Sequence, residues 1–445
     1  MDVQPNGRDA QQEAEKTVIA WFQQNAMPIQ HIPPGNGFAD LQPLKQILKE
    51  VKVAGLGETT HGTREIFQLK HRLLEFLVTE MNFNTFTIEA SSAACQPIND
   101  YILYGKGDRA TVLTGQWYVP WDTEEVSDML DWLRAYNQSV PDEKKVQFHG
   151  LDITRNENAR NAVLDYLRQV APGRVAATKT LFAALAKEEA KWPMQIDDDC
   201  EKTLLQLLPQ LQAVIDHLTA NKDSFVNASS LQKFDQTFQY ARVMKQFILA
   251  NVIDLLPPSR PKNTARSGYM AENLIWLTHQ AKPDTKYIVW AHNSHLRVVD
   301  AAVDEPNMGS CLRETFGQSY FVFGFEFNQG SFQTRIRLPE KLFGDLKAVT
   351  LPPSPAQSLS WYLSHTQREV FMLNLHVPLA NVVVEQWLAR PQPIHDVSWA
   401  YDDQAQDYLE MRSIQEYDGM IFIERTTASR PTVNAMKRVV KREGL

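Results

Sequence analysis

Two short segments of this chain place acidic and imidazole side chains directly after runs of apolar residues. The first segment is Gly55-Leu-Gly-Glu-Thr-Thr-His-Gly-Thr-Arg64, and the second is Ile288-Val-Trp-Ala-His-Asn-Ser-His-Leu296. Carboxylates and imidazoles are side chains that accept and donate protons during catalysis. We therefore predict one proton-transfer site with four candidate residues: Glu58, His61, His292 and His295.

The apolar run before each segment is typical of a buried strand. In an open α/β sheet, the loops that leave the carboxyl ends of parallel strands meet at one crevice, so residues far apart in sequence come together there. Glu89 follows the same pattern, because it comes directly after the strand predicted over 85–88. An acidic residue at a helix start also stabilises the helix, so the sequence leaves a structural interpretation of Glu58 and His61 open.

The surrounding sequence predicts alternating strands and helices. A strand over 52–56, a helix over 66–79 and a strand over 85–88 imply a parallel, right-handed crossover unit. The same patterns predict strands over 146–151, 287–291 and 419–424, helices over 93–103, 126–136 and 266–280, and a hairpin of 320–327 with 332–337 joined through Asn328-Gln-Gly330.

Two local interactions are expected beside these elements. Asp122 and Glu125 have the spacing of a capping box at the start of the helix over 126–136. Asp152 ends the third strand, and we expect it to form a structural ion pair with Arg155 that anchors the following loop.

The chain has 445 residues, which leaves room for a large core with a sizeable insertion. Between Arg155 and Leu256 no convincing strand pattern occurs, and apolar residues recur at helical spacing. We therefore predict an α/β fold, in which a three-layer core with a mostly parallel central sheet carries a large helical insertion. The predicted parts are an N-terminal extension (1–36), the first part of the α/β core (37–155), the helical insertion (156–258) and the second part of the core (259–445).

Composition and charge exclude several classes of function. Hydrophobic residues make up 43% and charged residues 22% of the chain, as in an ordinary globular protein. The net charge of −8 argues against nucleic acid or anionic lipid as a partner. No apolar stretch reaches the length of a membrane helix, and the amino end has no signal-peptide pattern, so we expect a cytoplasmic protein. The three cysteines have no C-x-x-C spacing, which indicates free thiols.

Several familiar motifs are missing or incomplete. Gly55 and Gly57 follow a strand, but Thr60 stands where a dinucleotide-binding G-x-G-x-x-G motif has its third glycine. No G-x-S-x-G nucleophile elbow and no H-E-x-x-H zinc motif occurs in the chain. These absences argue against a serine mechanism of the α/β-hydrolase type.

Ordered sequence blocks from about Phe38 to Glu424 resemble the erythromycin esterase family, whose members hydrolyse the ester of macrolide lactones. The blocks that carry this resemblance are Gly57-Glu-x-x-His61-Gly-Thr-Arg-Glu65 with Leu69-Lys-His-Arg72, Phe83 to Glu89, Asn99-Asp-Tyr101, Trp132-Leu-Arg-x-Tyr-Asn137, Gly150-Leu-Asp-Ile153, Met270-Ala-Glu-Asn273 and Ala291-His-Asn-x-His295. So many blocks in one order make the resemblance specific.

The resemblance implies a three-layer α/β core with a helical insertion and a deep cleft between them. It also implies that His61 is the general base, and that Glu58, Glu89, His292 and His295 occupy the other active-site positions.

Four further residues are expected to bind substrate or to support the site. Lys70 stands where some members of the family have an arginine, so the charge is kept but bidentate recognition is lost. The segment 117–121 is rich in aromatic residues, and we expect Trp117 and Trp121 to line a cleft for a large apolar ring. Arg64, in the first segment, completes this supporting set.

The residues and the resemblance together predict ester hydrolysis by an activated water. His61 would take a proton from the water, while Glu58 or Glu89 holds the imidazole in the productive tautomer. His292, His295 or a cation would stabilise the oxyanion and protonate the leaving alcohol. The expected substrate is the macrolactone ester of erythromycin-type macrolides, with antibiotic resistance as the result. We expect neither a metal nor another cofactor, because the imidazole and carboxylate pairs suffice.

Two alternatives stay open on the sequence. Glutamate and histidine also bind zinc or manganese, so a metal-dependent hydrolase of another ester or of a peptide could use the same residues. A binding protein with a relict site is the other alternative, and the complete set of titratable residues argues against it.

Overall fold

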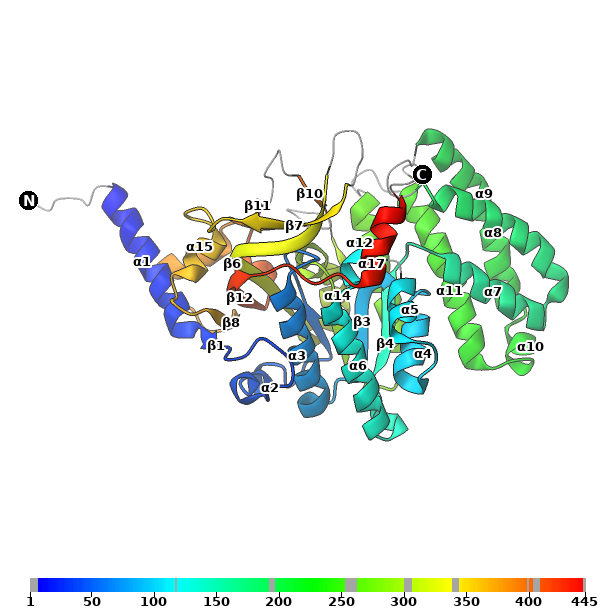
Figure 1. The fold of residues 1–445 in the computed structure, drawn as a ribbon, viewed down its shortest axis with the longest axis horizontal. Helices are drawn as coiled ribbons and strands as arrows, with labels where there is room; N and C mark the ends of the chain where they lie inside the picture. The colour runs from blue at the N-terminus through cyan, green and yellow to red at the C-terminus, as the bar shows by residue number, and fades with distance from the viewer. Residues whose placement is uncertain are drawn as a thin grey trace, which may run out of the picture.

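A sheet of ten strands forms the centre of this computed structural model, which describes residues 7–116, 118–191, 197–252, 262–299, 306–337, 344–397, 400–402 and 409–442. Helices lie on both faces of the sheet, and a further group of helices lies at one end of an elongated molecule (Figure 1). Within the described ranges, no helix is both long and apolar enough to cross a membrane.

Most neighbouring strands of the central sheet run parallel. The path through the sheet is β1 (Met27–Pro28), β8 (Val370–Asn374), β12 (Gly419–Thr426), β6 (Tyr320–Ile336), β2 (Val53–Leu56), β5 (Tyr287–Trp290), β3 (Thr85–Ser91) and β4 (Gln147–Asp152). Every pair from β12 to β4 is parallel, whereas β8 and β1 add antiparallel strands at one edge. The loops after β2, β3, β4 and β5 therefore leave from the same edge of the sheet.

Two layers of helices enclose this sheet. One layer consists of α2 (Leu44–Ile47), α3 (Arg64–Met81), α4 (Gln96–Tyr104), α5 (Arg109–Gly115) and α6 (Glu124–Ser139). The other layer consists of α1 (Gly7–Asn25), α12 (Lys262–Gln280), α13 (Asn293–Leu296), α14 (Met308–Phe316), α15 (Leu359–Ser364) and α16 (Val382–Ala389). The remaining elements outside the helical insertion are β7 (Leu346–Leu351), β10 (Ala400–Tyr401), a small sheet of β9 (Gln392–His395) with β11 (Leu409–Arg412), and α17 (Val433–Arg442).

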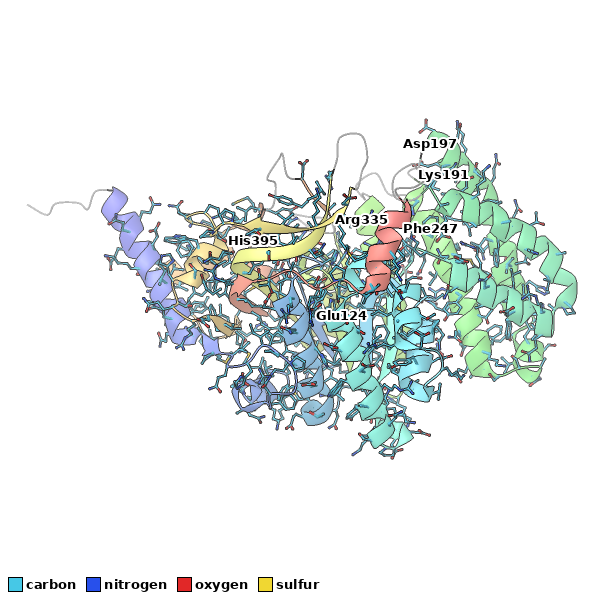
Figure 2. All side chains as sticks on the ribbon, in the orientation of Figure 1. Glu124, Lys191, Asp197, Phe247, Arg335 and His395 are labelled. Atoms are coloured by element: carbon cyan, nitrogen blue, oxygen red, sulfur yellow. The ribbon has the colours of Figure 1, made fainter. Side chains whose placement is uncertain are left out.

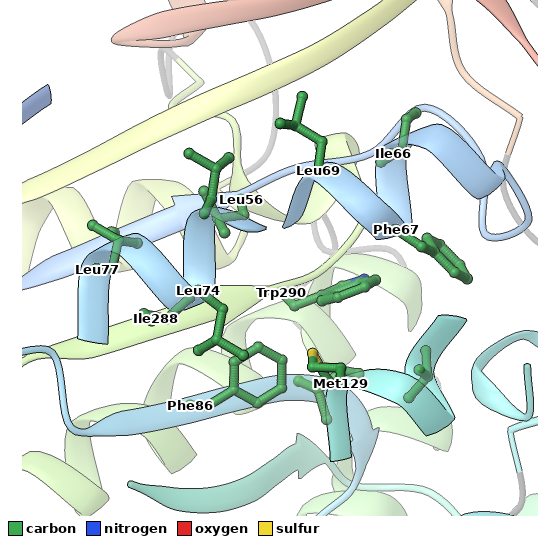
Figure 3. Packing of buried hydrophobic residues seen from close by; sticks show 14 of the residues in the cluster. Leu56, Ile66, Phe67, Leu69, Leu74, Leu77, Phe86, Met129, Ile288 and Trp290 are labelled. Atoms are coloured by element: carbon green, nitrogen blue, oxygen red, sulfur yellow. The ribbon is translucent and has the colours of Figure 1, made fainter. Parts of the chain in front are cut away.

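The central strands are buried on both faces. All residues of β2, β3 and β5 are buried, as expected when a parallel sheet lies between two helix layers. On one face, Leu56, Phe86 and Trp290 pack with the apolar residues of α3 (Figure 3). On the other face, Val289 packs in a second core with residues of α1, α12 and α14.

The helical insertion predicted after the third strand forms a unit with its own core. Its helices are α7 (Glu157–Val170), α8 (Val175–Glu189), α9 (Asp198–Ala220), α10 (Lys222–Asn227) and α11 (Leu231–Asn251). Leu204, Leu211 and Phe247 are fully buried inside this unit. Figure 2 labels Phe247, which belongs to α11. The three-layer α/β core, the mostly parallel sheet and the large helical insertion are thereby confirmed. The predicted end of the insertion, near residue 258, lies outside the described residues.

The predicted hairpin of 320–327 with 332–337 is wrong. One continuous strand, β6, covers both segments, and Gly330 lies inside it with a φ of +130°. A Cβ atom on Gly330 would lie 2.2 Å from the carbonyl oxygen of Thr426 in β12. The glycine therefore permits a close approach of the neighbouring strand instead of a turn. The outer half of β6 pairs with β7 rather than with its own first half.

The capping box predicted for α6 is also wrong. Thr123 caps this helix, and its Oγ1 accepts a hydrogen bond from the Val126 N–H at 3.3 Å. Asp122 and Glu125 instead bind residues 427–432, the segment after β12 that we call the strap. The partners of these two acidic residues lie about 300 residues away in the sequence. The spacing of Asp122 and Glu125 does not reveal such distant partners.

Helix α1 is part of the packed structure, although residues 1–36 were predicted to precede the core. Val18 and Phe22 are fully buried in the second core. The Phe22 ring lies edge-to-face against Trp387 of α16, with 5.5 Å between the ring centroids. The amphipathic stretch 13–24 therefore buries its apolar side against α16.

Asn137 of α6 holds the residue that leads into β4, and its removal should destabilise the fold. Its amide donates to the Val146 carbonyl oxygen at 2.9 Å and accepts from the Val146 N–H at 2.7 Å. We expect Asn137→Ala to lower the free energy of unfolding by about 1–3 kcal/mol, because buried backbone groups lose their partners. Denaturant unfolding measures the change. Gln138→Ala, at the exposed neighbouring position, is the control, and an equal loss in both variants would contradict the interpretation.

Candidate active site

The loop between β2 and α3 carries the first two candidate residues and contacts the loop after β5. The Asn293 N–H donates to the Glu58 carbonyl oxygen at 2.8 Å. Gly57 allows this approach, because a Cβ atom there would lie 2.1 Å from the Asn293 Oδ1 atom. Since β2 and β5 are neighbours in the sheet, the two sequence segments meet as predicted.

Strand β6 and the strap hold the same loop from the other side. The N–H groups of Gln333 and Ser429 both donate to the Gly62 carbonyl oxygen at 2.8 Å. The Arg64 N–H donates to the Thr427 carbonyl oxygen at 2.9 Å. A Cβ atom on Gly62 would lie 1.8 Å from the Gln333 carbonyl oxygen, so glycine is required at this contact. The backbone around His61 is therefore fixed by segments far apart in sequence.

Both oxygens of the Glu58 carboxylate are bound. Oε1 lies 2.7 Å from His61 Nδ1, and Oε2 accepts from Lys70 Nζ and from Trp290 Nε1, each at 2.8 Å. Glu58 and Lys70 have no exposed surface. Burial alone would raise the pKa of Glu58, but the charge of Lys70 and the hydrogen bond with His61 lower it below its ordinary value. The site therefore holds an ionised carboxylate.

His61 has one ring nitrogen that no described residue binds. Because ionised Glu58 can only accept, Nδ1 carries the proton and Nε2 is free in the neutral ring. The ring is 5% exposed and lies edge-to-face against Trp121 and His292, at centroid distances of 5.0 and 5.1 Å. Burial alone would lower the pKa of His61, but Glu58 and the charge of Glu89 raise it above its ordinary value. His61 can therefore accept a proton at Nε2.

Glu89 forms a second carboxylate centre inside β3, which continues two residues beyond it. Its Oε1 lies 3.1 Å from Arg266 Nη2 and 3.1 Å from His295 Nε2. Its Oε2 accepts from the His292 backbone N–H at 3.0 Å. Burial alone would raise the pKa of Glu89, but His295 and the Arg266 guanidinium lower it well below its ordinary value. The end of β3 is thus tied to the loop after β5.

Arg266 of α12 joins Glu89 to Asp152, the residue that ends β4. The guanidinium lies 2.8 Å (Nη2) and 3.0 Å (Nε) from the two Asp152 carboxylate oxygens and 3.2 Å (Nη2) from the Tyr118 hydroxyl. The predicted pairing of Asp152 with Arg155 is therefore wrong. Arg155 adopts a left-handed backbone conformation with a φ of +60°. The actual partner lies 114 residues further along the chain, where no local pattern points to it.

Both ring nitrogens of His292 are engaged. The Thr59 carbonyl oxygen can only accept, so His292 Nε2 donates to it, at 3.1 Å. Nδ1 accepts from the Ser294 backbone N–H at 3.2 Å and lies 2.8 Å from the Ser294 hydroxyl. Burial lowers the pKa of His292, so its ring is neutral near pH 7. This histidine joins the loop after β5 to the loop after β2.

Both ring nitrogens of His295 also lie close to polar partners. Its Nδ1 lies 3.0 Å from Ser267 Oγ, and its Nε2 lies 3.1 Å from Glu89 Oε1 and 3.2 Å from Arg266 Nη1. Of the three imidazoles in this group, His61 is the one with a free ring nitrogen.

Two of the predicted supporting residues lie in different environments. Lys70 belongs to the group, with its Nζ 4.4 Å from the centre of the Trp290 ring as well as bound to Glu58. Burial lowers the pKa of Lys70 to about 8. Arg64 does not join the group, because its side chain is 39% exposed and its Nε lies 3.6 Å from Glu125 Oε1.

The two predicted aromatic residues give different results. Trp121 is buried in the core beside His61, and its Nε1 donates to the Glu89 carbonyl oxygen at 2.9 Å. Trp121 was expected to line a substrate cleft, but it is a buried residue that packs against His61. Trp117 lies outside the described residues.

Arg266 and Trp290 complete the site, although neither was predicted as a member. Trp290 ends the strand two residues before His292, so its position at a strand end was an available signal. Arg266 lies in a helix after the insertion, and the sequence around it carries no pattern that marks an ion pair with two distant strands.

The donor set favours proton transfer over metal binding. Among the described residues, no group of three or more His, Cys, Asp or Glu side chains could hold a metal ion. Each carboxylate already pairs with a cationic side chain, Glu58 with Lys70 and Glu89 with Arg266. A metal ion at either carboxylate would have to compete with that cation.

The contact between Glu58 and His61 should be visible in the titration of the histidine. We expect Glu58→Gln to lower the pKa of His61, because the variant removes a negative charge that stabilises the imidazolium. NMR of ring-labelled histidine, followed across neutral pH, measures this shift. Glu80→Gln, at the exposed end of α3, should leave the titration unchanged. An unchanged or higher His61 pKa in Glu58→Gln would show that the carboxylate does not act on the ring.

Comparison with known proteins identifies relatives of this chain. The family model for erythromycin esterase matches residues 78–426. Erythromycin esterase type II of Escherichia coli is 25% identical over 322 residues, which cover 68% of this chain and 75% of that protein. YbfO of Bacillus subtilis (strain 168), provisionally named a hydrolase, is 24% identical over 435 residues, covering 93% of this chain and 92% of that protein.

Solved structures show the same fold. A protein from Bacillus cereus superposes with a TM-score of 0.78 at 24% identity, over 94% of this chain and 99% of that one. A mutant of erythromycin esterase EreC in its open conformation superposes with a TM-score of 0.66 at 15% identity, over 89% of this chain and 96% of that one. Because the family model spans most of the sequence, the chain belongs to the erythromycin esterase family, and this membership supports activity as an ester hydrolase.

Proposed function

We propose that this protein hydrolyses a carboxylic ester by activating a water molecule with His61, and that its substrate is the macrolactone ester of erythromycin-type macrolides. The observation that carries the mechanism is the free Nε2 atom of His61, beside two histidines whose ring nitrogens are engaged. Support for the substrate comes from the family and from a relative that is named an erythromycin esterase. Opening the lactone would destroy the antibiotic and give resistance.

In the first step, a water molecule gives a proton to His61 Nε2 while its oxygen attacks the ester carbonyl carbon. Glu58 keeps the ring in the tautomer with Nδ1 protonated and stabilises the imidazolium that forms. The raised pKa of His61 suits this role, because a general base works best with a pKa near the working pH. The bonds of Lys70 and Trp290 keep the Glu58 carboxylate in place.

In the second step, the tetrahedral intermediate collapses and the C–O bond of the ester breaks. The imidazolium of His61 returns its proton to the leaving alkoxide, so a macrolactone gives a ring-opened hydroxy acid. Arg266, whose side chain is 15% exposed beside Glu89 and His295, is the cation that we assign to the oxyanion. His292 and His295 position the groups around it.

Replacement of the proposed general base should remove activity without unfolding the protein. We expect His61→Ala to lower kcat for macrolide hydrolysis by about 10²–10⁴-fold or more, because the water loses its proton acceptor. In the unchanged protein, kcat/KM should fall as the pH drops through the raised pKa of His61, since only the neutral ring accepts a proton. His279→Ala, at an exposed position of α12, is the control. Full turnover by a folded His61→Ala variant would remove His61 from the mechanism.

Chelation separates this mechanism from that of a metal-dependent hydrolase of another ester or a peptide. We expect activity to survive prolonged treatment with a chelator followed by dialysis, because His61 and Glu58 activate the water without a metal. Elemental analysis of the dialysed protein should find no stoichiometric zinc or manganese. Loss of activity that one divalent ion restores would establish the metal-dependent reaction instead.

A further inference from the structure

A cavity of about 580 Å³ lies between the central sheet and the helical insertion. Residues of β4, α4, α11 and α12 line it, and none of the candidate catalytic residues does. Cavities of this size between two structural units are common places for small ligands. The cavity is therefore separate from the site that we assign to ester hydrolysis.

The floor of the cavity is a polar patch on the face of the sheet that also carries the second core. Thr85 of β3 pairs in register with Gln147 of β4 and with Tyr287 of β5. Residues in register share a face, so these side chains lie on the side of the second core, to which Tyr287 belongs. His149 lies on the same face of β4, since side chains alternate along a strand. All four residues line the cavity.

Side-chain amides form much of the walls. Gln239 of α11 donates to Asn273 Oδ1 of α12 at 2.8 Å, and Gln236 of α11 donates to Gln96 Oε1 of α4 at 2.5 Å. These bonds join the helical insertion to the core around the cavity. Each amide has two donors and two acceptor lone pairs, so it can bind a ligand as well as its neighbour.

The polar groups on the floor are uncharged near pH 7. Tyr287 is 3% exposed, and its buried hydroxyl has no hydrogen-bond partner among the described residues. Burial raises the pKa of Tyr287 to about 12 and lowers the pKa of His149 to about 4. Nε2 of His149 lies 3.0 Å from the Gln147 side-chain oxygen and donates to it, so Nδ1 is an acceptor. The floor therefore offers neutral donors and acceptors.

We infer that this cavity is a second ligand site and that it binds a neutral saccharide of one or two rings. Sugar hydroxyls both donate and accept hydrogen bonds, and amides offer both partners. Trp276, which also lines the cavity and is partly exposed, would supply an aromatic ring for the apolar face of a sugar. The Tyr287 hydroxyl would gain the partner that it lacks. The charged residues of the lining lie outside the strands that form the floor; they are Asp142, Glu143, Lys145, Asp235 and Lys282. The floor itself therefore has no counter-charge for an ionic ligand.

Calorimetry and saturation-transfer NMR on the full chain test this inference. The ligands are maltose, cellobiose and diacetylchitobiose, each with the hexasaccharide of the same sugar, and glucuronate serves as the charged control. We expect at least one neutral disaccharide to bind with millimolar or better affinity and glucuronate not to bind. If the disaccharide binds and the hexasaccharide does not, the ligand is a free sugar. If both bind equally well, the ligand is the end of a polysaccharide chain.

Two variants locate the binding. Trp276→Ala should weaken binding by about tenfold or more, since stacking and burial of the ring are lost. Tyr287→Phe removes the unpartnered hydroxyl, so it should weaken binding while leaving thermal stability unchanged. Tyr104→Phe, at a residue that is 65% exposed, is the matched control. The His61→Ala variant should bind the sugar normally, which keeps this test independent of the esterase proposal. Failure of all the neutral sugars to bind, or binding that neither cavity variant weakens, would overturn the inference.

Discussion

The buried ion pair of Glu58 and Lys70 is the interaction on which the rest of the site depends. Taking each ion out of water costs on the order of several kcal/mol, so such a pair persists only where hydrogen bonds satisfy the remaining polar atoms. Glu58 meets this condition through Lys70, His61 and the Trp290 indole. These partners come from α3, from the loop after β2 and from β5. The loss of any one would therefore leave a buried charge without part of its compensation.

The second carboxylate centre repeats this arrangement with different elements. Arg266 pairs with both Glu89 and Asp152, and thereby joins α12 to the ends of β3 and β4. His61 lies near both centres and is influenced by the carboxylate of each, which favours its protonated form. Because His292 and His295 are held by their own hydrogen bonds, the polar groups around His61 have little freedom to reorient. The surroundings of the proposed base are thus organised before any substrate binds.

Sequence patterns predicted the parts of this architecture that depend on local order. Apolar runs located the central strands, and the polar groups after β2 and β5 do meet, because parallel strands end at one edge. Contacts between distant segments were missed. Asp152 pairs with the distant Arg266, although the nearby sequence did not exclude a pair with Arg155. Gly330 allows the close approach of a neighbouring strand, although a glycine in that position also favours a turn. Both outcomes depend on which segments become neighbours after folding.

The strap has a consequence for the order in which the protein matures. Residues 427–432 bind the backbone around His61 and the acidic residues at the start of α6, yet the ribosome makes them after the whole sheet and the helical insertion. Segments made earlier can begin to pack during synthesis. The loop that carries His61 gains its outer hydrogen bonds only when the strap arrives. A nascent chain therefore stays without a fully ordered centre until the strap has been made.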